Sequence, residues 1–393
     1  MTEQTLADFL SESERAALFR PAGEARGLPG RCYGDAFYAL EQTHLFPRLW
    51  CAVAFASDLP EPGDMVPVDL AGWPLVLVRG GDGRIRAFHN ICRHRAMRLV
   101  AEPCKGRSAL VCPWHAWTYD LDGRLLATPK IGGDRRNSDP AIDITGLDLR
   151  EIACGQWLDL VYVNIDGKAE TFDRHMAPLN DLLADYEFSS LRYSGQQWGC
   201  DYPGNWKVSV EGAIEDYHLT WGHPQIVQGA RENNPRLHNA DRVFFANSSA
   251  RAYRDAKKDA GAVMGHDSRF PALLDPKAEQ RTYFMSLFPT GCFQTRHNQV
   301  LQGLMLPDGA ENTKVVFRHY YGGDAATDPA LEEERRRQEA QWRLVFEQDI
   351  PFVRSVHENY KRRDAAGIET RFSPLWEANV QRFQQTVVET LDG

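Results

Sequence analysis

The feature that most constrains this chain is a pair of short segments, "CRH" at residues 92–94 and "CPWH" at residues 112–115. Each segment carries one cysteine and one histidine. Thiols and imidazoles at such close spacing are typical metal ligands. Two Cys and two His also make a common zinc ligand set, so the residue types alone do not choose the metal.

The way the donors are shared between the two segments favours iron. In zinc-finger patterns the cysteines usually come from one turn and the histidines from another. Here each segment supplies one of each, as a two-iron cluster needs when two Cys hold one iron and two His hold the other. We therefore predict a Rieske-type [2Fe–2S] cluster, with a zinc knuckle as the alternative, on these four ligands: Cys92, His94, Cys112 and His115.

Composition excludes several classes of protein. The chain has 393 residues and a formal net charge of −9, whereas nucleic-acid-binding domains usually carry a basic patch. The longest apolar runs are too short to span a bilayer, and the first residues lack the features of a signal peptide. Eight cysteines without disulfide-framework spacing fit a reducing compartment. We predict a cytoplasmic protein without nucleic-acid or membrane partners.

The pattern along the chain predicts three parts. Residues 1–45 read as an N-terminal helical arm. Residues 46–165 hold short runs rich in Val, Leu and aromatics, with turn signals at Asp82-Gly83 and Asp122-Gly123, and predict a small antiparallel β domain. Residues 166–393 predict an α+β domain with a helix, a long irregular stretch, several strands and a long charged helix. Those segments are expected at residues 208–219, 224–280, 282–323 and 328–360, in that order.

A second group of metal-ligand residues lies in "EDYHLTWGHP", residues 215–224. Glu215 and His218 are three apart, which places them on one face of the predicted helix. His223 is five residues after His218 and would point elsewhere on a continuous helix. Gly222 is a helix-stop signal that lets the chain fold back and aim His223 at the same point.

A carboxylate on the long C-terminal helix completes this second group. Two His and one carboxylate on one face, with open positions, are typical of non-haem iron(II) sites that activate O2. Asp349 lies within an apolar stripe at helical spacing, where an unpaired carboxylate is costly. Glu347 and Glu358 fall off the stripe and are predicted to be solvated. The sequence thus predicts that Asp349 joins His218 and His223.

The segments "CRHRAMRL" and "CPWHAWTYDLDGRL" resemble the Rieske domain of the α (oxygenase) subunits of Rieske non-haem iron oxygenases. The N-W-K stretch and the downstream histidines resemble the same family. The resemblance implies an antiparallel Rieske domain followed by a helix-grip catalytic domain, in which the sheet wraps on a long C-terminal helix. It implies mononuclear iron at His218, His223 and Asp349. It also implies that Glu215, or less plausibly Asp216, bridges to a cluster histidine of a neighbouring subunit in a homotrimer.

The resemblance also implies an activity, oxygen insertion from O2. Electrons would come from NAD(P)H through a separate flavin and iron–sulfur reductase or a ferredoxin. The Glu bridge and the segment "LPGRCYGDAFYALEQTHLFPRLW" are similar to the branch of choline, carnitine and glycine-betaine monooxygenases and proline-betaine demethylase, which act on quaternary ammonium compounds. The segment "LFPTGCFQTRH" departs from that branch and leaves hydroxylation or dihydroxylation of an aromatic acid as the alternative. A cluster-only electron carrier is the alternative of another class.

Residues of the predicted strands are candidates for substrate binding. Aromatic rings could hold a cation, and basic side chains could hold a carboxylate, although most of the aromatic residues fit ordinary sheet core. The wider set is Tyr283, Phe284, Phe288, Phe293, Arg296, His297, Arg318, His319, Tyr320 and Tyr321. The five predicted substrate-binding residues are Phe284, Phe293, Arg296, His297 and Tyr320.

Overall fold

The computed structural model describes residues 4–225, 241–245, 247–254, 269–275, 277 and 281–392. The chain forms two compact units, residues 46–172 and residues 1–45 together with 173–393. The division into an arm, a Rieske domain and a catalytic domain at residues 45 and 165 stays a prediction. No helix of the described residues has the length and apolarity needed to cross a bilayer.

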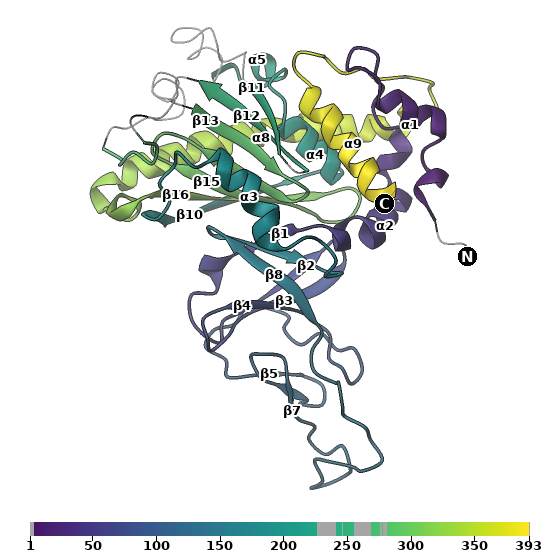
Figure 1. Ribbon diagram of the computed structural model, residues 1–393, viewed down its shortest axis with the longest axis vertical. Coiled ribbons are helices and arrows are strands. Elements are labelled where there is room, and N and C mark those ends of the chain that lie inside the picture. The colour runs from purple at the N-terminus through teal and green to yellow at the C-terminus, as the bar shows by residue number, and fades with distance from the viewer. Residues whose placement is uncertain are drawn as a thin grey trace. The chain divides into compact units, whose positions relative to one another are not determined.

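The unit of residues 46–172 is built from antiparallel strands (Figure 1). Six of them form one sheet in the order β1-β9-β8-β4-β3-β2, and β5, β6 and β7 form a smaller one. Both predicted Asp-Gly turns contain a glycine at positive φ, Gly83 at 79° and Gly123 at 82°. The strands are β1 (Cys51–Phe55), β2 (Met65–Leu70), β3 (Trp73–Arg79), β4 (Ile85–His89), β5 (Leu110–Val111), β6 (Thr118–Tyr119), β7 (Leu125–Ala127), β8 (Glu151–Trp157) and β9 (Leu160–Asn164).

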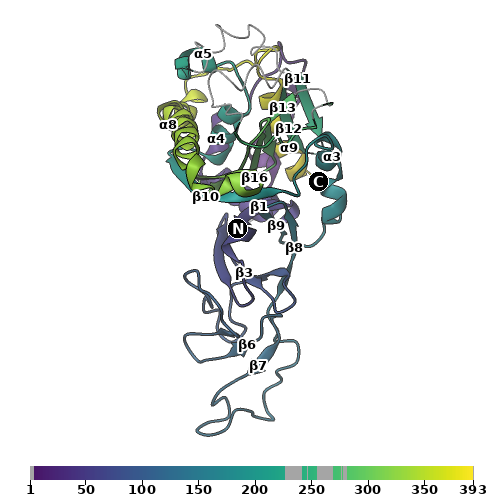
Figure 2. The same ribbon diagram turned by 90° about the vertical axis from the view of Figure 1, so that its left-hand side faces the viewer.

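The second unit contains a seven-stranded antiparallel sheet and several helices (Figures 1 and 2). The strand order is β10-β16-β15-β14-β13-β12-β11. The strands are β10 (Leu191–Tyr202), β11 (Asp241–Phe245), β12 (Ser248–Arg254), β13 (Arg281–Leu287), β14 (Gly291–Thr295), β15 (Val300–Pro307) and β16 (Thr313–Gly322). The helices are α1 (Glu12–Leu18), α2 (Asp35–His44), α3 (Phe172–Leu182), α4 (Trp206–Ala213), α5 (Leu219–Gly222), α8 (Glu332–Arg363) and α9 (Ala378–Asp392).

One face of the seven-stranded sheet packs against α8, which runs along it in Figures 1 and 2. The Trp198 ring of β10 and the Phe317 ring of β16 lie 5.1 Å and 4.6 Å from the Phe346 ring of α8. Tyr321 of β16 donates a 3.0 Å hydrogen bond to Gln338 of α8. The long helix therefore covers the sheet with the side that also carries Asp349.

The predicted α+β class, with an antiparallel β domain followed by a sheet-and-long-helix domain, is confirmed. Three local predictions are wrong. The helix predicted over residues 208–219 ends at Ala213, and a turn separates it from α5. The stretch predicted as irregular over residues 224–280 contains β11 and β12 among its described residues. Strand β10 was not predicted because its exposed polar positions hide the alternation that marks a strand.

Candidate metal sites

The two cysteine–histidine segments form two loops with the same backbone pattern. In each loop the cysteine N–H donates to the carbonyl five residues later, and the cysteine carbonyl accepts from the N–H four residues later. These four bonds measure 2.8 to 3.0 Å. The fourth residue after each cysteine, Ala96 or Ala116, has positive φ, 60° and 55°, which is uncommon for alanine. The matched loops present two equivalent sets of donors.

The four donors lie in two pairs. Cys92 and Cys112 are buried in the core of this unit, and burial, together with the neighbouring Cys92 thiol, raises the pKa of Cys112. The rings of His94 and His115 lie 4.7 Å apart. A single zinc ion would draw all four donors to about 4 Å from one another. Among the described residues, however, these four supply no three donors within 4.8 Å of one another.

Two pairs of donors fit a two-iron cluster, and the contacts of the neighbouring side chains are consistent with one. His115 Nδ1 is buried without a hydrogen-bond partner among the described residues, as a metal ligand would be. The His94 ring stacks on Trp117 at 4.8 Å. The Tyr119 oxygen accepts from Arg93 N at 3.1 Å and lies 3.6 Å from Cys92 Sγ, so its O–H can donate to the sulfur. Hydrogen bonds to sulfur tune the potential of such a cluster.

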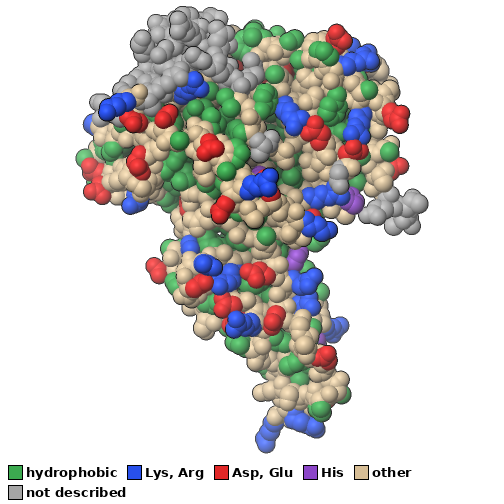
Figure 3. All heavy atoms as spheres, viewed as in Figure 1, with side chains coloured by type: hydrophobic (Ala, Val, Ile, Leu, Met, Phe, Trp, Pro, Cys, Tyr) green, Lys and Arg blue, Asp and Glu red, His purple; other side chains and the backbone are tan. Residues whose placement is uncertain are grey.

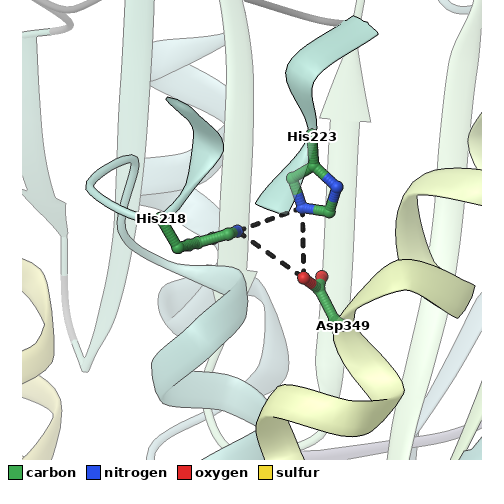
Figure 4. Close-up of side chains that lie close together, drawn as sticks. All are labelled: His218, His223 and Asp349. Carbon is green, nitrogen blue, oxygen red and sulfur yellow. Dashed lines mark hydrogen bonds and ion pairs between the residues drawn. The ribbon is translucent and has the colours of Figure 1, made fainter. Parts of the chain in front are cut away.

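The second site brings together the three residues predicted for it, which Figure 4 shows pointing toward one another. His218 Nε2 and His223 Nε2 lie 3.2 Å apart. Asp349 Oδ1 of α8 lies 3.7 Å from the first nitrogen and 3.1 Å from the second. All three donor atoms therefore lie within 4.8 Å of one another, close enough to share one metal ion.

Neighbouring side chains fix the orientation of both imidazoles. Glu215 Oε1 bonds His218 Nδ1, and Gln348 Oε1 lies 2.9 Å from His223 Nδ1. An acceptor at each Nδ1 keeps the hydrogen there and leaves each Nε2 as the metal-binding nitrogen. Burial alone would lower the pKa of His218, but the Glu215 carboxylate, and then Asp349, raise it above its usual value. The site is therefore electrostatically prepared for a cation.

The turn between α4 and α5 places Glu215 differently from the prediction. Glu215 and His218 do not share a helix face, because Glu215 lies in this turn. Its Oε2 accepts the backbone N–H of Tyr217 and, at 3.2 Å, that of His218. The carboxylate therefore holds the turn and the ligand together. Gly222 ends α5 as predicted, and a Cβ there would lie 3.3 Å from the His218 ring.

The N-W-K stretch anchors α4, the helix that leads into this turn. Asn205 caps the helix by accepting from Lys207 N at 3.1 Å. Trp206 Nε1 donates to Glu41 Oε2 at 3.0 Å, and Lys207 Nζ pairs with Glu41 Oε1 at 2.5 Å with both side chains fully buried. Breaking a buried pair on one side is strongly destabilising. These contacts fix α4 to α2 and so position the histidine turn.

Asp216 has a structural partner on strand β12. Its carboxylate pairs with the buried Arg251 guanidinium, which also donates to the carbonyls of Ala213 and Glu215 at 2.6 and 2.8 Å. Glu215, by contrast, lines a pocket of about 380 Å³ with His218 and Asp349. This placement favours Glu215 over Asp216 as a bridge toward the metal site.

The five predicted substrate-binding residues divide between the two faces of the sheet. Paired residues on neighbouring antiparallel strands share a face. Phe284 pairs with Gln294 and lies 6.3 Å from the Trp342 ring of α8, so it faces the helix. Phe293 packs on Phe188 at 6.0 Å on the opposite face.

The remaining three follow the same division. Tyr320 lies 5.7 Å from Tyr193 and shares the face of Phe293. Arg296 faces α8, where its guanidinium lies 4.9 Å from the Trp342 ring. His297 lies in the turn between β14 and β15, and its side chain is buried. Phe284 and Arg296 therefore lie on the face of the sheet that is covered by α8, the helix that carries Asp349. Phe293 and Tyr320 lie on the opposite face.

Sequence reasoning missed Gln348, Arg251 and Trp342. Gln348 directly precedes Asp349, so a polar residue beside the predicted ligand was the available signal. Arg251 lies in a stretch that was expected to be irregular. Trp342 lies seven residues before Asp349, two helical turns away on the same face, and that spacing could have indicated it.

Two family models match this chain. Residues 49–137 match the Rieske [2Fe-2S] domain, and residues 188–393 match the ring hydroxylating alpha subunit (catalytic domain). The glycine betaine monooxygenase oxygenase subunit of Chromohalobacter salexigens is 33% identical over 242 residues, 60% of this chain and 52% of that protein. The carnitine monooxygenase oxygenase subunit of Escherichia coli K12 is 31% identical over 204 residues, 51% of this chain and 53% of that protein. The chain thus spans about half the length of the curated relatives it matches.

Solved structures share the fold. The quaternary ammonium Rieske monooxygenase CntA with γ-butyrobetaine has a TM-score of 0.76 at 20% identity, over 96% of this chain and 98% of that one. Naphthalene 1,2-dioxygenase with indole has a TM-score of 0.72 at 18% identity, over 94% and 92%. Two metal sites, a Rieske domain and this catalytic domain define an iron oxygenase class. The chain belongs to the ring-hydroxylating α-subunit family of Rieske oxygenases.

Proposed function

We propose that this chain is the oxygenase component of a Rieske-type oxygenase that inserts oxygen from O2 into a small organic substrate. The observation that carries the proposal is the convergence of His218, His223 and Asp349 in a chain that also holds the paired cysteine and histidine loops. An iron(II) ion held by two imidazoles and one carboxylate keeps positions open for O2 chemistry. A cluster-only electron carrier would have no use for this second site.

The four loop residues would hold the [2Fe–2S] cluster, which supplies electrons singly. His94 and Trp114 are exposed, so this end of the Rieske unit is accessible to another protein surface. Glu215 would connect a cluster histidine of a neighbouring subunit to His218 in a homotrimer. Its support is the bond to His218 Nδ1 and its place in the pocket of about 380 Å³. A solved relative whose published description includes inter-subunit electron transfer has the same fold, with a TM-score of 0.77.

The remaining side chains of the site hold protons and exclude water. Glu215 and Gln348 keep the Nδ1 hydrogens of the two imidazoles in place. His223 is only about 1% exposed, and the side chains of His218 and Asp349 are 24% and 18% exposed. A site this buried separates an oxidising reaction from bulk water.

The substrate we propose is a quaternary ammonium compound of the betaine type, oxidised at an N-methyl carbon with release of formaldehyde. Support comes from the glycine betaine and carnitine monooxygenase relatives. The electron donors would be NAD(P)H and a separate reductase, with or without a ferredoxin, and the location would be the cytoplasm.

A second candidate is hydroxylation or dihydroxylation of an aromatic acid. The biphenyl dioxygenase α subunit of Paraburkholderia xenovorans is 27% identical over 344 residues, 79% of this chain and 74% of that protein. The observation that favours it is that two rings on the α8-facing side already face guanidinium groups. Arg296 lies 4.9 Å from Trp342, and Arg251 lies 4.5 Å from Phe284. These ring faces are less suited to a second cation.

The test is anaerobic purification with iron and sulfide counts, electron paramagnetic resonance, and O2 consumption with a surrogate reductase. A Rieske signal, a further mononuclear iron and substrate-dependent O2 uptake are expected. Formaldehyde release from a betaine supports the first substrate class, whereas a hydroxylated benzoate or cinnamate supports the second. Colourless, iron-free protein would contradict the proposal.

A further inference from the structure

Where α8 covers the seven-stranded sheet, several buried polar atoms lack hydrogen-bond partners among the described residues. They are Nε2 and Oε1 of Gln299, Nδ1 of His319 and Nε1 of Trp342. The three side chains are between 0 and 3% exposed. Buried polar groups are nearly always hydrogen-bonded, so several on one surface indicate a polar ligand that completes them.

These atoms lie at one level of the sheet. The residues two before and two after His319 on β16 both contact α8, one at Phe346 and the other at Gln338. Trp342 lies midway between these helix residues and therefore lies opposite His319. Gln299 precedes β15, where its neighbour two residues later pairs with His319. That diagonal position places the two side chains about 7–8 Å apart at their backbones, on one face.

The Trp198 indole fixes which nitrogen of His319 carries the hydrogen. Trp198 Nε1 lies 2.9 Å from His319 Nε2. Because an indole can only donate, Nε2 is the acceptor and Nδ1 carries the hydrogen. Burial lowers the pKa of His319 to about 3, so the ring stays neutral. His319 therefore offers a fixed N–H donor at Nδ1.

Arg296 brings a cation to this level. The Arg296 guanidinium lies 4.9 Å from the Trp342 ring centre. Arg296 and Gln299 flank a two-residue turn, and the backbone N–H of Arg296 donates to the Gln299 carbonyl at 2.8 Å, so their side chains share a face. The group thus combines two fixed N–H donors, an amide that can donate, and a cation. Such a set is complementary to an anionic acceptor.

We propose that Gln299, His319, Trp342 and Arg296 bind the carboxylate of the substrate, so that the substrate is an organic acid. The proposal rests on the proposed oxygenase function and specifies its substrate class. Trp342 lies seven residues before Asp349, about 10 Å along the helix. The substrate would therefore lie between this group and the triad, which are about two helical turns apart along α8.

The experiment measures binding rather than turnover, by calorimetry on the anaerobic cluster-loaded protein. Each probe is an acid paired with a neutral or cationic analogue that lacks the carboxylate. The pairs are 4-(trimethylammonio)butanoate with butyltrimethylammonium, and cinnamate with cinnamamide. We expect at least one acid to bind about 10-fold to 100-fold more tightly than its partner, the range for hydrogen bonds to a charged group.

Variants then assign the effect to the proposed residues. Trp342→Phe keeps the ring and removes the N–H, and Gln299→Leu removes the amide; each is expected to weaken the acid about 10-fold and leave its partner unchanged. His319→Asn places an N–H near the position of Nδ1 and should retain binding, whereas His319→Gln places it near Nε2 and should not. Tyr193→Phe, on the opposite face of the sheet, is the matched control.

Two outcomes overturn the inference. One is that no acid of the panel binds below about 10 mM, or that each acid and its partner bind equally well. The other is that His319→Asn and His319→Gln weaken binding equally. Failure of the proposed function gives a different result. In that case the protein binds acids selectively, so the carboxylate-binding residues act as proposed, but it consumes no O2 with any acid.

Discussion

The two candidate metal sites of this chain differ in their exposure to solvent and in how their donors are arranged. In the Rieske unit two matched loops hold four candidate donors as two separate pairs, and His94 and Trp114 are exposed. In the second unit a turn and a long helix bring three donors to one point that is largely buried. Exposure suits the exchange of electrons with other proteins, while burial suits a reaction that must exclude water. The face of the molecule drawn in Figure 3 carries both acidic and basic side chains.

The largest expected effect comes from removing a donor of the candidate cluster site. Cys112→Ser should lose the cluster, and with it two of three irons and all reductase-driven turnover, because a hydroxyl is a poor ligand for iron–sulfur clusters. The triad should keep its iron. Iron and sulfide counts with electron paramagnetic resonance measure both. Cys104→Ser is the control, since Cys104 is a thiol of the same unit outside the two loops.

Removing a donor of the buried site should have the reverse pattern. Asp349→Ala should lose the mononuclear iron and lower turnover by more than about 100-fold. Changing a residue that only hydrogen-bonds a metal ligand typically costs about 10- to 100-fold, and loss of a ligand should cost more. The Rieske signal should be unchanged. Glu347→Ala, an exposed carboxylate two residues earlier on α8, should behave like the wild type. Full turnover with bound iron in Asp349→Ala would show that the triad is not the iron site.

The connection between the sites can be tested at two adjacent acids. Glu215→Gln keeps one oxygen as the acceptor for His218 Nδ1 but removes the charge and the oxygen that accepts the backbone N–H groups of the turn. Turnover should fall about 10- to 100-fold with both metal sites loaded, and stability should fall by about 1 kcal/mol for the lost backbone hydrogen bond. Asp216→Asn instead leaves the buried Arg251 cation without its carboxylate, which should cost about 3 kcal/mol of stability. Turnover per folded, iron-loaded chain and denaturant titration separate the two. Equal loss of turnover in both variants would argue against a special role for Glu215.

The sequence predicted which residues the structure brings together at each candidate site, because each group depends on a short pattern. The four candidate cluster ligands lie in two short segments, and the choice of Asp349 follows from one apolar stripe on one helix. Features that depend on register or on distant pairing could not be predicted. Phe284 and Phe293 look alike in sequence, yet the strand register places them on opposite faces of the sheet.

Contacts between distant elements were equally hidden. The Arg251 guanidinium reaches the metal-site turn from β12, a strand that its polar composition conceals. The predicted helix over residues 208–219 placed Glu215 beside His218, and the two side chains are in contact. The contact, however, is made by a turn and not by a helix face. The prediction continued the helix on local propensity, whereas α4 ends at Ala213 and the Glu215 carboxylate bonds backbone N–H groups of the turn that follows.

The smallest expected effect concerns Glu211, which lines the same pocket as Glu215 but lies one helical turn earlier. Burial raises the pKa of Glu211 to about 7, while Tyr33 and Gln384, which donate to its Oε1 at 2.8 and 2.9 Å, lower it in part. A carboxyl with a raised folded-state pKa stabilises the fold fully below its unfolded pKa, and this contribution is lost as pH rises through 7. Glu211→Gln, which mimics the protonated acid, should therefore match the wild type at pH 5 and be more stable at pH 8, by at most about 3 kcal/mol. Denaturant titrations of both proteins at these two pH values measure the difference, and a constant offset across pH would mean that Glu211 does not titrate in this range.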